Sequence, residues 1–306
     1  MDEHPLVSVI IPTRNRPEDV EDCLRSLYQQ SYSAFEVIVV DASPNEKTKE
    51  VIQKKFPQVH YEYFPKGDNQ RPQAKNIGIR IAKGQILAFI DDDSLVQEGW
   101  MEACVNSYSS PETGGVGGFI VEKREENVAP HEKDYVARIT FNGTRIGTFN
   151  FDKGETIEVE HLRGCNMSFR REAVEKIAGF DPNYIGSNVL EETDFCVRIR
   201  KAGYKILYNP RMRVIHTAGT RYLVQRTVFD YKRQYYITRN ATYFMLKNYN
   251  ALRTLAYILT NNTSVPAFLR KPDAPKFNCI FVGIWGKIVG LWVGVKKICV
   301  LKARYK

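Results

Sequence analysis

Short apolar runs and amphipathic segments alternate along the first hundred residues. Four runs predict strands, at residues 6–11, 35–40, 59–64 and 86–90, and the first has the apolar pattern of a buried strand. Helix signals separate them: one helix opens at Pro17, a second follows a capping-box pattern from Ser43 to Glu46, and a third covers 71–82 with Gly84 as its closing glycine. This βαβαβαβ order predicts an α/β fold with a mostly parallel, doubly wound sheet flanked by helices.

The pattern is looser after residue 115. We expect a glycine-rich strand at 116–121, further strands at 156–160, 164–169, 205–208 and 213–216, and helices at 171–177 and 188–202. Beyond residue 225 the chain has a helical pattern with many aromatic and basic side chains. The sequence therefore predicts a compact α/β region followed by a helical extension.

Polar residues follow three of the predicted N-terminal strands. They are Thr13, Arg14 and Asn15 after the first, Asp41 after the second, and Asp91, Asp92 and Asp93 after the fourth. Ligands of doubly wound sheets bind beyond these carboxyl ends. Neither a Gly-x-Gly-x-x-Gly turn nor a P-loop is present, which argues against a Rossmann dinucleotide site and against P-loop nucleotide hydrolases.

Three consecutive aspartates after an apolar strand require compensation by positive charge. On extended backbone Asp91 and Asp93 point the same way, so they could share one hard cation such as Mg²⁺ or Mn²⁺. A solvated acidic turn is the alternative interpretation of the triplet.

A second acidic cluster, Glu191, Glu192 and Asp194, stands at the start of a predicted helix. The helix dipole explains part of this cluster, and a general base is the functional interpretation. His216 lies just past a predicted strand end. A lone histidine is more often a core or surface residue than a ligand, so only its neighbours can assign it a role.

Composition and charge narrow the function classes. The chain has 306 residues, of which 43% are hydrophobic and 26% charged, as in globular proteins. Its six cysteines show no metal-binding spacing, and no signal-peptide pattern opens the chain, so we expect a reducing, cytoplasmic compartment. Residues 266–306 hold nine Lys or Arg and one acid, a net charge of +8, whereas residues 1–265 carry 35 Lys or Arg against 34 acids.

The basic tail is also apolar. Residues 277–295 are only just long enough to span a bilayer, and Lys287 lies near their centre. One helical stripe holds Gly283, Lys287, Gly290, Gly294 and Lys297, and another holds Ile280, Ile284, Ile288, Leu291, Val295 and Ile298. This pattern predicts an interfacial helix on an anionic membrane surface, with no nucleic-acid partner. A helix packed on the catalytic domain is the alternative.

The order of short motifs resembles family 2 glycosyltransferases of the GT-A fold. The segments that carry the resemblance are residues 9–15, 39–41, 74–78, 89–93, 164–167, 170–171, 179–181, 191–194, 203–204 and 216. By this resemblance, residues 1–225 are the catalytic domain, with a nucleotide-sugar-binding half at 1–115 and an acceptor half at 116–225. Residues 226–306 are then a helical C-terminal region.

The resemblance implies a site-residue set. The donor would be bound by Pro12, Thr13, Arg14, Asp41, Arg71, Lys75, Asn76, Asp91 and Asp92. Gly164 and Asn166 would line the acceptor pocket. Asp93, Asp91 and His216 would hold Mg²⁺ or Mn²⁺. Glu192 occupies the position of the catalytic base, where many relatives have Asp, with Glu191 and Asp194 as the other candidates.

The implied activity is a metal-dependent inverting transfer of a sugar from a nucleotide-diphosphate donor, with a UDP-sugar expected. The acceptor would be a hydroxyl of a glycan or lipid-linked molecule, met at the cytoplasmic face of a membrane. Two rivals remain: a nucleotidyltransferase on a similar sheet, and an inactive sugar-nucleotide-binding protein. The first usually has a glycine-rich loop after strand one, which residues 12–16 lack, and the intact acids argue against the second.

Overall fold

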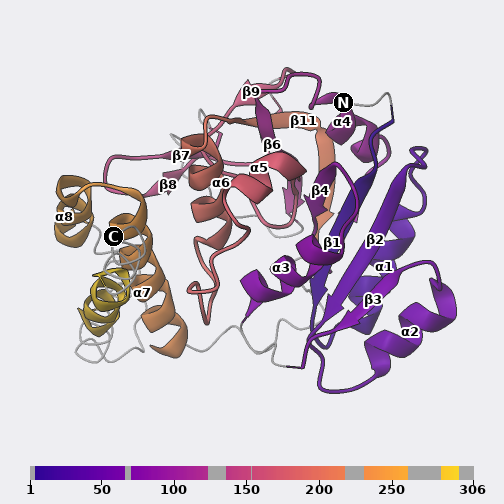
Figure 1. Ribbon diagram of the computed structural model, residues 1–306, viewed down its shortest axis with the longest axis horizontal. Helices are drawn as coiled ribbons and strands as arrows, with labels where there is room; N and C mark the ends of the chain where they lie inside the picture. The colour runs from indigo at the N-terminus through magenta and orange to yellow at the C-terminus, as the bar shows by residue number, and fades with distance from the viewer. Residues whose placement is uncertain are drawn as a thin grey trace.

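The computed structural model describes residues 4–65, 70–122, 136–152, 154–217, 231–260 and 284–295. Within these ranges, nine strands form one mixed sheet with the order β3-β2-β1-β4-β10-β6-β11-β5, and β9 pairs with β11 (Figure 1). The four predicted N-terminal strands are parallel: β1 Val7–Thr13, β2 Phe35–Asp41, β3 His60–Tyr63 and β4 Ile86–Phe89. The predicted α/β class with a mostly parallel sheet is confirmed.

The later strands complete the sheet in a different order from the chain. They are β5 Ser94–Val96, β6 Thr113–Glu122, β9 Ile157–Glu158, β10 Met167–Arg170 and β11 Lys205–His216, while β7 Arg138–Ile139 and β8 Arg145–Ile146 form a small separate sheet. The two strands expected at 205–208 and 213–216 are one long strand, whose register against β6 shifts between Asn209 and Val214. The sequence pattern predicts a break between two strands at this point, but the strand continues to pair with β6 on both sides of the shift.

Helices cover the sheet. They are α1 Pro17–Leu27, α2 Lys47–Lys55, α3 Arg71–Ile81, α4 Trp100–Asn106, α5 Arg171–Lys176 and α6 Glu191–Lys201. Helix α3 packs on β1 and β2, and α6 packs on β6 and β11. The central strand β1 is fully buried except near its end, which explains why its sequence is continuously apolar rather than alternating.

Two expected helix-capping roles are wrong. Helix α2 begins at Lys47 without a side-chain cap, because the Ser43 hydroxyl donates to Asp41 instead. Gly84 does not adopt the left-handed conformation of a closing glycine. A Cβ there would lie 2.5 Å from the carbonyl oxygen of Leu6, so glycine is required by close approach to the chain before β1. Tertiary contacts therefore take both residues away from their local roles.

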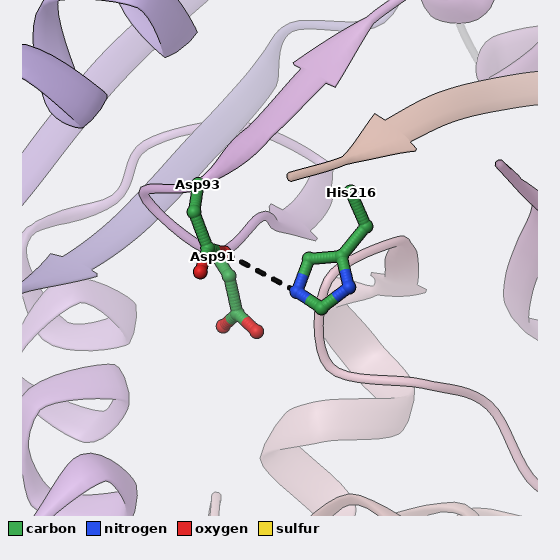
Figure 2. Close-up of side chains that lie close together, drawn as sticks. All are labelled: Asp91, Asp93 and His216. Carbon is green, nitrogen blue, oxygen red and sulfur yellow. Dashed lines mark ion pairs between the residues drawn. The ribbon is translucent and has the colours of Figure 1, made fainter. Parts of the chain in front are cut away.

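Strand order determines which chain ends meet. The carboxyl ends of β1, β2 and β4 share one edge, and the end of β11 pairs with β5 so that His216 lies opposite Ser94. This pairing brings the histidine beside Asp91 and Asp93, although they are more than 120 residues apart in the chain (Figure 2). A polar site is thus assembled at the sheet edge.

The C-terminal region forms a helical group on the side of the molecule away from β2 and β3 (Figure 1). It comprises α7 Tyr231–Asn248, α8 Ala251–Thr260 and a helix over residues 284–295. The last helix packs on α7 through Gly286, Gly290 and Gly294, and a Cβ at Gly290 would lie 2.5 Å from the carbonyl oxygen of Arg239. The small glycines thus let the two helix backbones approach closely.

This packing bears on the expected C-terminal stripes. Gly290 and Gly294 of the first stripe face α7. Ile284, Ile288 and Val295 of the apolar stripe are each about half exposed. Residues 277–283 and 296–298 of the expected stripes lie outside the described residues. Among the helices that the structure describes, none has the length and apolar character needed to cross a bilayer.

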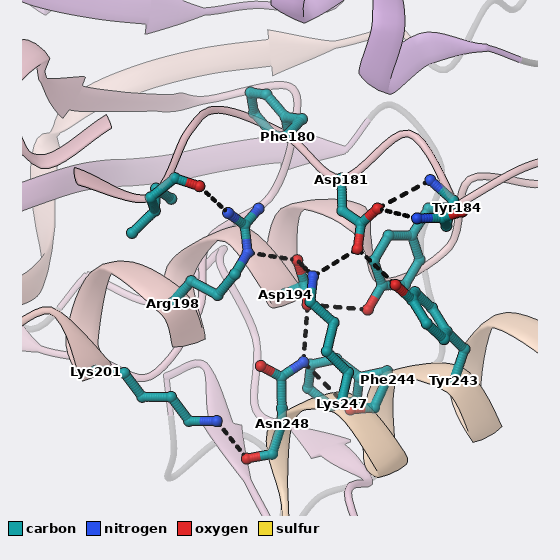
Figure 3. Close-up of polar contacts among 12 residues, drawn as sticks. Phe180, Asp181, Tyr184, Asp194, Arg198, Lys201, Tyr243, Phe244, Lys247 and Asn248 are labelled. Atoms are coloured by element: carbon teal, nitrogen blue, oxygen red, sulfur yellow. Dashed lines mark hydrogen bonds and ion pairs between the residues drawn. The ribbon is translucent and has the colours of Figure 1, made fainter. Parts of the chain in front are cut away.

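Helix α7 is fastened to α6 by a buried polar network around Asp194 (Figure 3). The Asp194 carboxylate pairs with Arg198 and Lys247, each at 2.8 Å, and accepts hydrogen bonds from Tyr184 and Asn248. Burial alone would raise the pKa of Asp194, but Arg198 and Lys247 hold it below its ordinary value. The charged carboxylate is therefore the form that joins the two helices.

We expect Asp194→Asn to destabilise the protein by about 3–5 kcal/mol, because it leaves buried cations without their counter-charge. Thermal unfolding at neutral pH measures the effect. Since the pKa is lower in the folded state, the stabilisation by Asp194 is present above the pKa of an unfolded Asp, about 3.9, and is lost as the pH falls further. Glu112→Gln, which removes the exposed pair with Lys205, is the control and should change little. Equal melting temperatures for Asp194→Asn and wild type would contradict this role.

Candidate functional site

A cavity of about 540 Å³ opens beyond the carboxyl ends of β1 and β4. Ten of the residues expected in the site line it: Pro12, Thr13, Arg14, Arg71, Asp91, Asp92, Asp93, Gly164, Glu192 and His216. They come from six separate stretches of the chain. The topology of the sheet therefore gathers most of the expected site in one place, and we call this space the donor cavity.

Asp91, Asp93 and His216 form the acidic side of the donor cavity (Figure 2). One ligand atom from each lies within 4.8 Å of the others. His216 Nε2 is 3.3 Å from Asp93 Oδ1, and its Nδ1 is 2.8 Å from Glu122. The chain turns after Asp91 instead of continuing as a strand, yet the two aspartates still meet as the alternation argument expected.

This cluster fits a divalent cation by its donor set. Carboxylate oxygens suit Mg²⁺ and Mn²⁺, and an imidazole is compatible with Mn²⁺. Asp93 Oδ1 is buried and faces His216 Nε2 at 3.3 Å, so one carboxylate oxygen and one ring nitrogen converge on the same point. Glu122 orients the imidazole from the opposite ring nitrogen, an arrangement common behind metal-binding histidines.

Asp92 points away from this cluster. It accepts hydrogen bonds from the Thr13 hydroxyl and from Arg16, both at 2.8 Å, and Arg16 also pairs with Asp93 at 2.9 Å. Burial raises the pKa of Asp92 to about 7 despite Arg16. Burial lowers the pKa of His216, but Asp93 and Glu122 outweigh this and raise it to about 10. Arg16 and His216 thus balance the acids when no cation is bound.

The basic side of the donor cavity is formed by Arg14, Arg71 and Arg163. The Asp91 carboxylate is the main cause that raises the pKa of Arg71, so this guanidinium stays charged. Arginines beside a carboxylate cluster provide the forked donors that bind phosphate groups well. The cavity can therefore hold a diphosphate between a cation site and guanidinium groups.

Glu192 stands at the boundary between the donor cavity and a second cavity of about 570 Å³. It lines both spaces, as do Arg163, Val189 and Arg233. Its side chain is partly exposed, whereas its neighbour Glu191 is buried. Of the three acids at this helix start, Glu192 is the one that can reach molecules bound on both sides.

Glu191 is held inside the protein by Lys75. The two side chains are each 1% exposed and their charged atoms are 3.0 Å apart. Burial raises the pKa of Glu191, and Lys75 opposes this. Neither residue lines either of these two cavities, and their buried pair joins α3 to the start of α6. This contact favours a positioning role for Lys75 and Glu191.

Three other expected binding residues are also engaged within the fold. Asp41 accepts hydrogen bonds from Ser43 and Tyr61 through both carboxylate oxygens. Asn76 exchanges two hydrogen bonds with the backbone of Phe180. Asn166 accepts from the Trp100 indole and donates to two carbonyls. None of the three lines the donor cavity, and their side chains are engaged in hydrogen bonds within the fold.

Several polar residues of the two cavities were not identified from the sequence: Arg16, Glu122, Arg145, His161, Arg163 and Arg233. Arg16 could have been identified from the sequence, because it belongs to the polar loop that follows β1. Glu122 and His216 end strands β6 and β11, but only the pairing of those strands makes them neighbours. The others have no local signal, since their role arises from convergence of distant segments.

Comparisons with known proteins agree with this geometry. Glycosyl transferase family 2 matches residues 8–178, more than half of the chain, and the N-terminal domain of galactosyltransferase matches residues 145–220. A glucosyl-dolichyl phosphate glucuronosyltransferase of Haloferax volcanii is 28% identical over 240 residues, covering 74% of this chain and 72% of the relative.

Two solved structures share the fold. S. aureus TarS in complex with UDP-GlcNAc has a TM-score of 0.64 at 16% identity, over 90% of this chain and 79% of that one. GalNAc-T7 with UDP, GalNAc and Mn²⁺ has a TM-score of 0.62 at 19% identity, over 81% of this chain. Our chain spans about half (51%) of the GalNAc-T7 chain.

The family match covers the strands, the aspartate triplet and the loop that line the donor cavity, and the fold match covers the sheet that places them. The chain therefore belongs to glycosyl transferase family 2 and is a glycosyltransferase with the GT-A fold.

Proposed function

We propose that this protein transfers a sugar from a nucleotide-diphosphate donor, a UDP-sugar, to a hydroxyl of a lipid-linked or glycan acceptor, with inversion at the anomeric carbon. The observation that carries the proposal is the position of Glu192 between the donor cavity and the second cavity. Relatives named for dolichyl phosphate and undecaprenol substrates, and the UDP-bound structures that share the fold, support it.

Asp91, Asp93 and His216 would hold a Mg²⁺ or Mn²⁺ ion. Such an ion, when bound, neutralises the negative charge that develops on the leaving diphosphate. Arg71 and Arg14 face the same space and stabilise that charge as fixed guanidinium groups. Arg16 holds Asp92 and Asp93 in place, so the acids are positioned before the donor arrives.

Glu192 is the proposed general base. An acceptor hydroxyl in the second cavity would give its proton to this carboxylate while its oxygen attacks the anomeric carbon. Attack from the side opposite the nucleotide gives inversion. The buried Lys75–Glu191 pair fixes the start of α6, so that the adjacent Glu192 points to the boundary between the cavities.

The C-terminal helices provide a surface suited to a membrane, where a lipid-linked acceptor would be found. Exposed apolar side chains are Leu252, Leu255 and Leu259 on α8 and Ile284, Trp285, Ile288, Trp292 and Val295 on the last helix, each about half or more exposed. Lys287 donates to the carbonyl of Ile258, so the two helices are neighbours. Tryptophan is favoured at membrane interfaces, and the +8 charge of residues 266–306 suits anionic headgroups. We propose peripheral attachment through this surface.

A screen of sugar nucleotides tests the activity itself. Release of UDP from a UDP-sugar should require a divalent cation, be lost in excess EDTA and return with Mn²⁺. Asp93→Ala should abolish it, because both the cation ligand and the partner of Arg16 are removed. A nucleotidyltransferase would release no UDP from these donors and would instead release pyrophosphate when given a nucleoside triphosphate and a sugar 1-phosphate, whereas an inactive binding protein would release neither. Full activity in EDTA would refute the metal requirement.

Glu192→Gln should lower kcat by roughly 10²–10⁴-fold, the usual contribution of a positioned base, with little change in donor affinity. Single-turnover transfer and titration of UDP measure the two quantities. Glu191→Gln is the informative control, because it should chiefly lower the melting temperature by leaving Lys75 buried and unpaired. If folded Glu191→Gln or Asp194→Asn loses more kcat than Glu192→Gln, the base is another carboxylate. A retained anomeric configuration would exclude this mechanism.

Flotation with phosphatidylglycerol-containing vesicles tests the membrane surface. Wild-type protein should float at low salt and less at high salt, since screening weakens attraction to anionic lipid. The double variant Trp285→Ser, Trp292→Ser should float less and still bind UDP. Tyr63→Ser is the matched control, because Tyr63 is a 51% exposed aromatic residue on β3, outside the C-terminal helices. Wild-type protein that does not float at low salt would disprove the attachment.

A further inference from the structure

The second cavity differs in chemistry from the donor cavity that it adjoins. Its polar lining includes three arginines, Arg145, Arg163 and Arg233, and the buried His161, but only two acids, Glu122 and Glu192. Its volume of about 570 Å³ is within the range of ordinary ligand sites. An acceptor that offered only hydroxyl groups would not explain this excess of cations.

The two acids offset only part of this excess, because Glu122 is shared between Arg163 and His216. Glu122 already pairs with Arg163 at 3.0 Å and with His216. Glu192 faces the boundary with the donor cavity. Arg145, at the start of β8, makes no side-chain hydrogen bond or ion pair with any described residue, and its side chain is accessible from the cavity. The protein thus presents to this space a guanidinium that has no hydrogen-bond or ion-pair partner among the described residues.

His161 gives a second, independent indication of a ligand. It is only 5% exposed and lines the cavity, yet neither ring nitrogen has a hydrogen-bond partner within the described part of the chain. Its ring packs edge-on against Phe149 at 5.6 Å, which fixes its position. Burial, with the nearby Arg145 and Arg163, lowers the pKa of His161 to about 3, so the ring is neutral and can donate one N–H. Buried polar groups without partners are rare in folded proteins.

We infer that the second cavity binds a phosphate group of the acceptor, held by Arg145 and Arg163 with His161 as an additional donor. A phosphate offers more acceptor oxygens than a carboxylate and is bound well by several forked guanidinium groups. The inference rests on the proposed transferase function, because it assigns this cavity to the acceptor. Glu192 lies on the wall of the same cavity, so the phosphate belongs to a sugar at or next to the one that carries the reacting hydroxyl.

Binding to the intact protein, without turnover, tests this assignment. The three probes are dodecyl glucosyl phosphate, glucose 1-phosphate and the uncharged dodecyl glucoside. Each is titrated calorimetrically in the presence of UDP and Mn²⁺. We expect both phosphate probes to bind, and Arg145→Gln to weaken both by about 10- to 100-fold, the range for a charge-assisted hydrogen bond. His161→Phe should weaken binding of the phosphate probes by a smaller factor. Because phenylalanine keeps the ring contact with Phe149, this loss of affinity would come from the missing N–H donor.

Arg138→Gln is the matched control, since Arg138 is an exposed arginine on β7, the strand paired with β8, and does not line the cavity. It should bind both phosphate probes as wild type does. UDP binding should be unchanged in all three variants, which shows that they fold.

The three probes separate the sources of the phosphate. Tighter binding of the dodecyl ester than of glucose 1-phosphate indicates a lipid-linked acceptor, and equal binding indicates a soluble sugar phosphate. Equal affinity of dodecyl glucoside and the dodecyl ester, unchanged binding in Arg145→Gln, or no binding of either phosphate probe to wild type would overturn the inference. The UDP-release screen is a separate measurement, so an inactive protein that still binds phosphate through Arg145 would refute only the proposed function.

Discussion

The site of this protein depends on the cost of placing several carboxylates together at one edge of the sheet. Asp91, Asp92 and Asp93 follow β4 directly, and the end of β6 adds Glu122. Mutual repulsion and burial both oppose such a cluster unless positive charge compensates it. Arg16 and His216 supply that charge in the protein alone. The same requirement explains why a divalent cation and a diphosphate would fit there together.

A second ionic constraint sets the geometry of α6. Its first turn carries three acids that have separate surroundings: Glu191 is buried against Lys75, Asp194 is buried among α7 side chains, and Glu192 remains partly exposed at the cavity boundary. Two of the acids therefore hold the helix from opposite sides, toward α3 and toward α7. Glu192 alone of the three remains accessible from the cavities, because Glu191 and Asp194 are buried in ion pairs that hold the helix.

The C-terminal region connects the site to its surroundings. Helix α7 contributes Arg233 to both cavities and Lys247 to the network around Asp194, so it belongs to the catalytic unit as well as to the helical group. The glycines of the last helix lie against α7, which turns its large apolar side chains outward. Close backbone packing on one face thus leaves apolar side chains exposed on the opposite face.

The sequence by itself determined the order of strands and helices, the α/β class and the family motifs, because buried parallel strands need continuous apolar runs and their polar ends are visible as local pattern. It also identified the acids that we propose as metal ligands and the helix start that carries the proposed base. Only the tertiary structure decided which polar residues face a cavity. Lys75, Asn76 and Asn166 belong to motifs yet are turned into the fold, whereas Arg145 and His161 have no motif and line the second cavity. Burial and convergence depend on strand pairing and helix packing between distant segments, which no local pattern contains.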